Sequence, residues 1–271
     1  MLVLIYFELR LVITMLDKSK LSHISKTNEN SSNVSAAEIE RFDNLAESWW
    51  DANGKYKTAL IFNQARLSYF IPQICQRFGK DPSQGDCLKG LTILDVGSGG
   101  GLVCEPLAAR GAAVVGIDAS AMSIEVAKRH ALKSGLTIDY RHMLSSDLSK
   151  QDEKFDVVIN AEVVEHVPDQ SALIKQCGDL TKDAGFVILA TLNRTLKSYI
   201  IAILGAEYVM RYLPVGTHSW TKFVKPRELN QMASSAGLTQ ISESGMAYNP
   251  ISGRWRLTKS LSVNYIQCYK K

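Results

Sequence analysis

The sequence predicts an α/β protein built on a doubly wound, mostly parallel sheet of seven strands. Short apolar segments alternate with helix-length segments from residue 91 onward, and this alternation favours parallel βαβ units with right-handed crossovers. The strand segments are apolar along most of their length, as in Val-Val-Gly-Ile at 114–117 and Phe-Asp-Val-Val-Ile at 155–159. Such runs are typical of a sheet covered by helices on both faces.

The expected elements follow in chain order. Ser35 and Glu38 form a capping box that predicts the start of a first helix, and a second helix is expected over 59–78. Further helices are expected up to Arg110, over 120–134 before Gly135, and over 228–236 before Gly237. The expected strands are 91–96, 113–118, 137–143, 155–160 and 186–191, with 238–247 and 261–269 as an antiparallel edge.

Residues 1–35 are predicted to be a flexible or misassigned extension. Their first part is apolar but is interrupted by Glu8 and Arg10, and the apolar stretch is too short for a good membrane span. Met15 is a candidate for the true start, and a targeting segment is the alternative. One domain is expected over 36–271, divided into a helical lead (36–80), a cofactor-binding core (88–193), a helical insertion (194–236) and C-terminal strands (237–271).

Composition narrows the classes of function. The 271 residues carry 31 Lys and Arg against 27 Asp and Glu, a net charge of +4 that falls short of a nucleic-acid-binding signature. The five cysteines are odd in number and none forms a CxxC pair, so a disulfide framework or structural zinc site is not expected.

A glycine-rich turn is expected to carry the main function. The segment Asp95-Val-Gly97-Ser-Gly99-Gly-Gly101 follows an apolar strand and precedes a helix. Glycine lets the backbone reach φ > 0 and lets a ligand approach without meeting a Cβ. The N-terminus of the following helix offers free N–H groups to a phosphate or a carboxylate.

Asp118 ends the second expected strand, 21 residues after Gly97, where an acid in a doubly wound fold binds both ribose hydroxyls. A dinucleotide and S-adenosylmethionine both fit a glycine turn plus a ribose acid. The dinucleotide pattern would place Leu102 where a glycine or alanine is needed. Asp95, Gly97, Gly99 and Gly101 match the methyltransferase pattern in full, so S-adenosylmethionine is the predicted cofactor.

Several further segments indicate a family. They are Glu-Ser-Trp-Trp-Asp at 47–51, Phe-Asn-Gln-Ala-Arg-Leu at 62–67, Ala-Glu-Val-Val-Glu-His-Val-Pro at 161–168, Thr-Leu-Asn-Arg at 191–194, Gly-Ala-Glu-Tyr at 205–208, Gly-Thr-His at 216–218 and Tyr-Asn-Pro-Ile at 248–251. Together they resemble the ubiquinone-biosynthesis O-methyltransferases (UbiG type), which are class I, Rossmann-like enzymes. The resemblance extends from about residue 36 to the C-terminus.

The resemblance implies methylation of 2-polyprenyl-6-hydroxyphenol and 3-demethylubiquinol, and it implies site residues. Arg66, Gly97 and Asp118 match cofactor-binding positions of the family, and Ala161 matches another where relatives often have methionine. Ser98 stands where cysteine is usual. The family also assigns a divalent metal to positions that match Glu162, Glu165 and His166, which suit Mg²⁺ or, through the histidine, Zn²⁺.

The three polar residues after the fourth strand leave three interpretations open. At i, i+3 and i+4 they share one face if the turn is helical, which would suit a metal site. Alternatively His166, with Glu165 beside it, supplies a metal-free general base, since histidine titrates near neutral pH. In the third interpretation Pro168 ends the turn early, and the polar groups cap the loop and contact the cofactor.

The expected partners are a polyprenyl phenol or quinol substrate, a peripheral membrane lipid surface and other ubiquinone-biosynthesis enzymes, with no nucleic acid. The stretch 196–215 is apolar with Lys197 and Arg211 and predicts an amphipathic interfacial helix or a lid. The expected location is the cytoplasm, peripheral on the inner membrane, or else the matrix face of the mitochondrial inner membrane. The rival functions are an O-methyltransferase of a soluble phenol, a nicotinamide-dependent oxidoreductase and a non-catalytic scaffold.

Overall fold

The computed structural model describes residues 33, 35, 39–40, 50, 57–199, 220–249 and 253–271. In these residues eight strands form one sheet in the order β3-β2-β1-β4-β5-β8-β6-β7. Strands β1 to β5 pair parallel with one another, whereas β8 pairs antiparallel with β5 and with β6, and β6 pairs antiparallel with β7 at the edge. The predicted α/β class with a mostly parallel sheet is confirmed, and the sheet has one strand more than predicted.

The strands and helices of the described residues have the following bounds. The strands are β1 (Thr92–Val96), β2 (Ala113–Asp118), β3 (Asp139–His142), β4 (Phe155–Ala161), β5 (Thr181–Leu192), β6 (Thr239–Asn249), β7 (Arg254–Thr258) and β8 (Asn264–Lys270). The helices are α3 (Lys57–Arg77), α4 (Cys104–Ala108), α5 (Ala121–Lys133), α6 (Ser145–Leu148), α7 (Gln170–Asp179), α8 (Leu196–Ser198) and α9 (Pro226–Ser235), with short 3-10 turns η3 (Val164–His166) and η5 (Trp220–Lys222).

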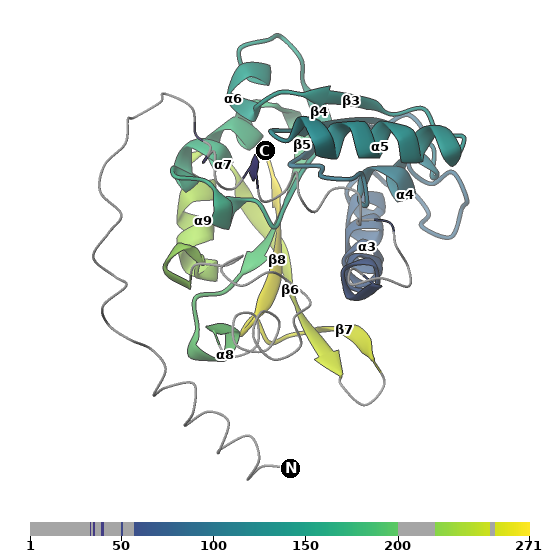
Figure 1. Ribbon diagram of the computed structural model, residues 1–271. Coiled ribbons are helices and arrows are strands. Elements are labelled where there is room, and N and C mark those ends of the chain that lie inside the picture. Colours follow the sequence, from purple (N-terminus) through teal and green to yellow (C-terminus); the bar gives the residue numbers. More distant parts are fainter. Residues whose placement is uncertain are drawn as a thin grey trace. The chain divides into compact units, whose positions relative to one another are not determined.

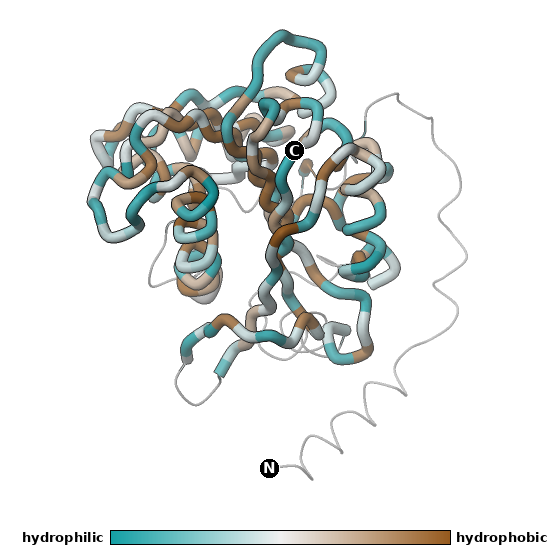
Figure 2. Tube along the Cα trace, turned by 180° about the vertical axis from the view of Figure 1, so that it is seen from behind, coloured by the Kyte–Doolittle hydropathy of each residue, from teal (hydrophilic) through white to brown (hydrophobic). Residues whose placement is uncertain are grey.

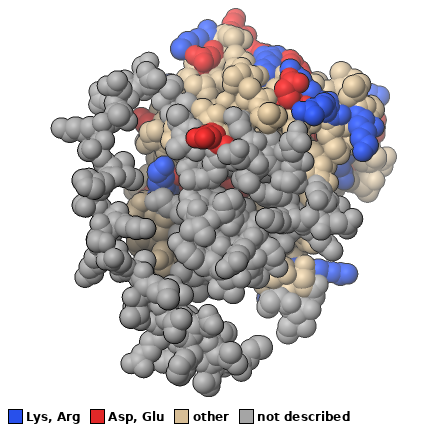
Figure 3. Space-filling view, viewed as in Figure 1, with Lys and Arg blue, Asp and Glu red and all other residues tan. Residues whose placement is uncertain are grey.

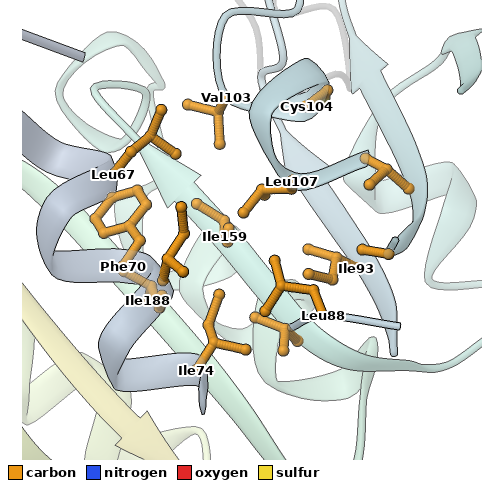
Figure 4. Packing of buried hydrophobic residues seen from close by; sticks show 14 of the residues in the cluster. Leu67, Phe70, Ile74, Leu88, Ile93, Val103, Cys104, Leu107, Ile159 and Ile188 are labelled. Carbon is orange, nitrogen blue, oxygen red and sulfur yellow. The ribbon is translucent and has the colours of Figure 1, made fainter. Parts of the chain in front are cut away.

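Helices cover both faces of the sheet, as Figure 1 shows for α3, α4 and α5 against α7 and α9. Successive strand residues point to opposite faces, so Ile93 joins the core under α3 to α5 and Leu94 joins the core under α7 and α9. Figure 4 shows the first core, where α3 directs Leu67, Phe70 and Ile74 toward the central strands. In Figure 2 the apolar residues gather along the strands at the centre, with polar residues on the outer turns.

Side-chain caps explain where two of the helices begin. The Ser120 hydroxyl accepts a hydrogen bond from the amide of Ser123 at the start of α5, and Asp169 accepts one from Ala172 at the start of α7. Gly135 follows α5 with φ +67°, the left-handed conformation that commonly ends a helix. Of the predicted first helix only Ile39 and Glu40 are described, and both are helical.

Two differences from the predicted elements have physical causes. The strand β7 was missed because Arg254-Trp-Arg-Leu-Thr258 is short and carries two arginines. Strand β5 begins at Thr181 rather than 186, because Thr181 still pairs with Phe155 of β4. The predicted extension 1–35 and most of the stretch 196–215 lie outside the described residues, apart from 33, 35 and 196–199.

Charged side chains of both signs lie next to one another on the upper part of the face in Figure 3. Among the described residues, oppositely charged side chains form ion pairs such as Arg141 with Glu153 at 2.6 Å and Lys150 with Asp147 at 2.9 Å. Within the described ranges, no helix is both long enough and apolar enough to cross a membrane.

Candidate active site

The candidate site lies at the carboxyl ends of β1, β2 and β4. Strand β1 pairs with β2 on one side and with β4 on the other, so the chain order of the strands reverses at β1. In open α/β sheets a crevice forms outside the carboxyl ends of the strands at such a switch point, and ligands bind there. The residues predicted to bind a cofactor follow these strand ends.

The glycine turn after β1 is held by backbone hydrogen bonds. The amides of Gly97 and Ser98 both donate to the carbonyl of Ile117, at 2.8 and 3.0 Å, and the Gly101 amide donates to Ser98 at 2.9 Å. Gly97 has φ +78° and Gly101 has φ +86°, and a Cβ would overlap Val163 at the first and the Tyr140 hydroxyl at the second. Both positions therefore require glycine.

Asp118 joins the glycine turn to the end of β2. One of its carboxylate oxygens accepts a hydrogen bond from the amide of Gly99 at 2.8 Å, and the other accepts one from the amide of Ser120 at 2.8 Å. A carboxylate oxygen can accept more than one hydrogen bond, so the same group can also accept ribose hydroxyls. The two sequence motifs, separated along the chain, are in direct contact.

Asp95 lies beneath the turn and is 2% exposed. The thiol of Cys104 donates to its Oδ2 at 3.3 Å. Burial raises the pKa of the Asp95 carboxyl from 3.8 to about 6, while the hydrogen bond from Cys104 and the charge of Arg66 oppose the rise. The Ser98 and Tyr140 hydroxyls, close to the same turn, are buried and have no hydrogen-bond partner among the residues that the structure describes.

Arg66 reaches the site from α3. Its Nη2 donates to Oδ1 of Asn63 at 3.0 Å, its Nη1 lies 3.9 Å from Glu162, and its Cζ lies 4.9 Å from the centre of the Phe62 ring. Burial lowers the pKa of the guanidinium from its ordinary value, although Glu162 and Asp95 both act to raise it. Its Nε is buried and has no hydrogen-bond partner in the described part of the chain, which suits a residue that binds an anionic ligand.

The backbone turns sharply where β4 ends. Ala161 is the last residue of β4 and pairs with Ala190 of β5. Glu162 follows with φ +58°, a left-handed conformation that is uncommon for a residue with a side chain. Its amide donates to Ala190 at 2.8 Å, which holds the turn in place. Backbone conformations of this kind concentrate at functional sites.

Glu165 and His166 belong to η3, which follows this turn. Glu165 is 2% exposed, and its Oε2 accepts a hydrogen bond from the Thr191 hydroxyl at 2.8 Å. Burial and the nearby Glu162 raise the pKa of the Glu165 carboxyl well above 4.5. The His166 imidazole is partly exposed on the same turn.

The three predicted metal ligands are not arranged as a metal site. Glu162 lies beside Glu165 and raises its pKa, but Glu162 also lies 3.9 Å from Arg66, and Glu165 accepts a hydrogen bond from Thr191. The helical turn that would align both with His166 is broken by the left-handed Glu162. Within the described ranges, no group of three His, Cys, Asp or Glu side chains is arranged to hold a metal ion. The arrangement therefore does not fit the metal site that the family resemblance implies.

The structure brings most of the predicted cofactor residues together. Gly99 contacts Asp118, Gly97 packs against Val163 beside Glu162, and Arg66 lies near both Glu162 and Asp95. One residue was missed by sequence reasoning. Asn63 is buried, holds Arg66, and donates to the carbonyl of Leu102 at 2.6 Å. Its i, i+3 spacing from Arg66 on a helix was the available signal.

The fold and the glycine turn define a class I methyltransferase. A family model described as a methyltransferase domain matches residues 62–243. The fold resembles magnesium protoporphyrin IX methyltransferase from Synechocystis PCC 6803, with a TM-score of 0.60 and 19% identity over 87% of this chain and 95% of that one. It also resembles a SAM-dependent methyltransferase from Thermotoga maritima, with a TM-score of 0.59 and 17% identity over 87% and 98% of the two chains.

Sequence similarity gives the particular family. The chain is 48% identical to a ubiquinone biosynthesis O-methyltransferase from Chelativorans sp. (strain BNC1) over 88% of its length and 94% of the relative's. It is also 48% identical to the enzyme of that name from Mesorhizobium japonicum, over 89% and 96% of the two chains. The chain belongs to the ubiquinone biosynthesis O-methyltransferases.

Proposed function

We propose that the protein transfers a methyl group from S-adenosylmethionine to a phenolic oxygen of polyprenyl intermediates in ubiquinone biosynthesis. The proposed acceptors are 2-polyprenyl-6-hydroxyphenol and 3-demethylubiquinol. Membership of the family supports the reaction. The observation that carries the cofactor assignment is the contact of Asp118 with Gly99, which joins a ribose-binding acid to a glycine turn of the methyltransferase pattern.

The described residues divide the work of holding the cofactor. Asp118 would accept the ribose hydroxyls, since its carboxylate is already oriented by two backbone amides. Arg66 would take the carboxylate of the amino-acid part, because its buried Nε has no hydrogen-bond partner among the described residues. Ala161, at the end of β4, would contribute through its backbone.

The chemical difficulty is the acceptor. Bound S-adenosylmethionine supplies a methyl group on a sulfonium, which is a good leaving group. A phenol with a pKa near 10 is ionised in only about one molecule in a thousand at pH 7, so supplying the phenolate costs about 4 kcal/mol. His166, partly exposed after β4, would take the phenolic proton on an imidazole nitrogen, and a positioned base typically contributes about 10²–10⁴-fold.

Aromatic side chains next to Arg66 support an aromatic acceptor. Phe62 of α3 lies edge-on to Trp255 of β7, with ring centroids 4.7 Å apart, and Tyr248 of β6 lies 5.4 Å from Trp255. All three rings are partly exposed. In the sheet order, β6 and β7 lie on one side of β4, and β2, which carries Asp118, lies on the other. These rings are therefore assigned to binding of the acceptor rather than of the ribose.

A membrane surface is part of the proposal, because a polyprenyl substrate resides in a bilayer. Leu196 is 72% exposed and Trp220 is 38% exposed, and these two apolar side chains flank the stretch 200–219. Exposed apolar groups of this kind favour contact with a lipid surface. We place the protein in the cytoplasm, peripheral on the inner membrane, with the mitochondrial matrix face as the alternative and other ubiquinone-biosynthesis enzymes as candidate partners. Co-sedimentation with anionic vesicles tests the surface contact.

The metal that the family resemblance implies stays a prediction. Among the described residues Glu162, Glu165 and His166 are not arranged to hold a metal ion, so the proposed reaction gives no role to Mg²⁺ or Zn²⁺.

Calorimetric titration with S-adenosylmethionine tests the central claim. Saturable binding that Asp118→Ala weakens at least tenfold is expected, together with methyl transfer to a short-chain prenyl catechol followed by mass spectrometry. No binding by the wild-type protein would overturn the cofactor assignment. Equal turnover of plain catechol and prenyl catechol would favour the rival function, methylation of a soluble phenol.

A further inference from the structure

Trp50 contacts the glycine turn from a segment that precedes the sheet. Its indole N–H donates to the carbonyl of Gly100 at 2.8 Å. The indole also lies flat on the imidazole of His130, with ring centroids 3.6 Å apart and planes 3° apart. One side chain thus contacts both the turn after β1 and the helix α5 that follows β2.

The His130 ring is itself fixed. Its Nδ1 lies 2.7 Å from Oε1 of Glu105, and the Ser134 hydroxyl donates to the other oxygen of that carboxylate at 3.2 Å. Glu105 is buried in the first turn of α4, directly after the glycine turn. Trp50 therefore rests on a surface built from α4 and α5.

The contact fixes a peptide that would otherwise turn easily. The peptide between Gly100 and Gly101 has glycine on both sides, so little steric resistance opposes its rotation. Trp50 holds its carbonyl, and the Gly101 amide donates to Ser98 at 2.9 Å. Rotation of this peptide would exchange the positions of a carbonyl and an N–H group beside the ligand crevice.

We propose that Trp50 is a positioning residue for S-adenosylmethionine, which keeps the glycine turn in its binding conformation by holding the Gly100 carbonyl. The inference rests on the proposed function, because it concerns the same cofactor site. Trp50 contacts the turn through the carbonyl of Gly100, so its contribution is preorganisation, which raises affinity by lowering the cost of ordering the site.

Calorimetry on Trp50→Phe and Trp50→Leu tests this role. The phenylalanine keeps a ring for His130 and loses only the N–H, so we expect the dissociation constant for S-adenosylmethionine to rise about 3–10-fold. The leucine loses the ring contact as well and should bind more weakly still. At saturating cofactor, kcat of Trp50→Phe should stay within about twofold of wild type, because the reacting groups are untouched.

Trp220→Phe is the matched control. The Trp220 indole also donates to a backbone carbonyl, that of Thr195 at 3.0 Å, but outside the glycine turn. Its cofactor affinity should equal that of wild type, and it should keep any change in tryptophan fluorescence that the cofactor induces, whereas Trp50→Phe should lose that change. Wild-type affinity in Trp50→Phe would overturn the inference alone, while absence of binding in the wild type would overturn the proposed function. If Trp50→Leu does not fold, the dissociation constant of Trp50→Phe for S-adenosylmethionine still tests the inference.

Discussion

Asn63 and Arg66 are joined by a 3.0 Å hydrogen bond between one turn of α3 and the next. Because Asn63 also donates to Leu102 at 2.6 Å, this single amide connects α3, the buried guanidinium and the segment after the glycine turn. A positively charged side chain is thereby held in a buried position where its ligand is expected.

Asn63→Leu should lower the free energy of unfolding by about 1–3 kcal/mol. The substitution leaves the Leu102 carbonyl and an Arg66 N–H buried without partners, and a buried polar group without a partner costs that much. Urea unfolding measures the change. Gln64→Leu, at the exposed next position, is the control and should stay within about 0.5 kcal/mol of wild type. Equal effects of the two variants would show that Asn63 does not hold this connection.

Gly101→Ala should abolish binding of S-adenosylmethionine. The alanine Cβ would overlap the Tyr140 hydroxyl at a residue with φ +86°, so the turn must change its conformation. Gly135→Ala is the matched control, because Gly135 also has positive φ but a Cβ there meets nothing within 4 Å. That variant should lose about 1 kcal/mol of stability and bind the cofactor normally. Normal binding by Gly101→Ala, measured by calorimetry, would contradict the geometry.

His166→Ala should lower kcat about 10²-fold or more and leave the cofactor dissociation constant unchanged, because a general base acts on the acceptor proton alone. Steady-state kinetics and calorimetry measure the two quantities. Added imidazole should restore part of the rate in His166→Ala.

The metal is tested in parallel. Wild type and Glu162→Gln are assayed after treatment with a chelator and again after addition of Mg²⁺ or Zn²⁺. Recovery in the wild type that is absent in Glu162→Gln would support a metal ligand at Glu162, although the described residues are not arranged as a metal site. Full activity of His166→Ala would show that His166 is not the general base.

The parts of the fold that were predictable are those governed by local rules. The apolar run before Asp95 and the spacing of Gly97, Gly99 and Gly101 locate β1 and its turn, because parallel strands buried on both faces have a recognisable composition. The contact of Asp118 with Gly99 followed from the topology, since neighbouring parallel strands end at the same edge.

The parts that were not predictable depend on contacts between distant segments. The stacking of Trp50 on His130 leaves no periodic signal in either segment. The edge strand β7 is short, contains two arginines and was not predicted. The prediction that Glu162 and His166 share one face assumed a helical turn. The left-handed backbone of Glu162 cannot be inferred from spacing.

Asp95→Asn should raise the free energy of unfolding near neutral pH. Burial is the main cause that raises the pKa of the Asp95 carboxyl from 3.8 to about 6. The folded protein therefore holds this proton more tightly than the unfolded chain does. The stabilising contribution of the protonated Asp95 carboxyl is full below about pH 4 and is lost as the pH rises through about 6. At ~1.4 kcal/mol per pKa unit, the ionised group costs up to about 3 kcal/mol at pH 7.

Urea unfolding of wild type and Asp95→Asn between about pH 4 and pH 8 checks this window. The stability difference between them should grow from about pH 4 to pH 6 and then level off. Asp147→Asn, at an exposed carboxylate paired with Lys150, should show only a small difference that does not grow in the same window. A constant difference for Asp95→Asn would contradict the burial argument. A costly buried charge persists where function needs it, and the ionised Asp95 attracts the Arg66 guanidinium, so the stabilised variant should also bind S-adenosylmethionine more weakly.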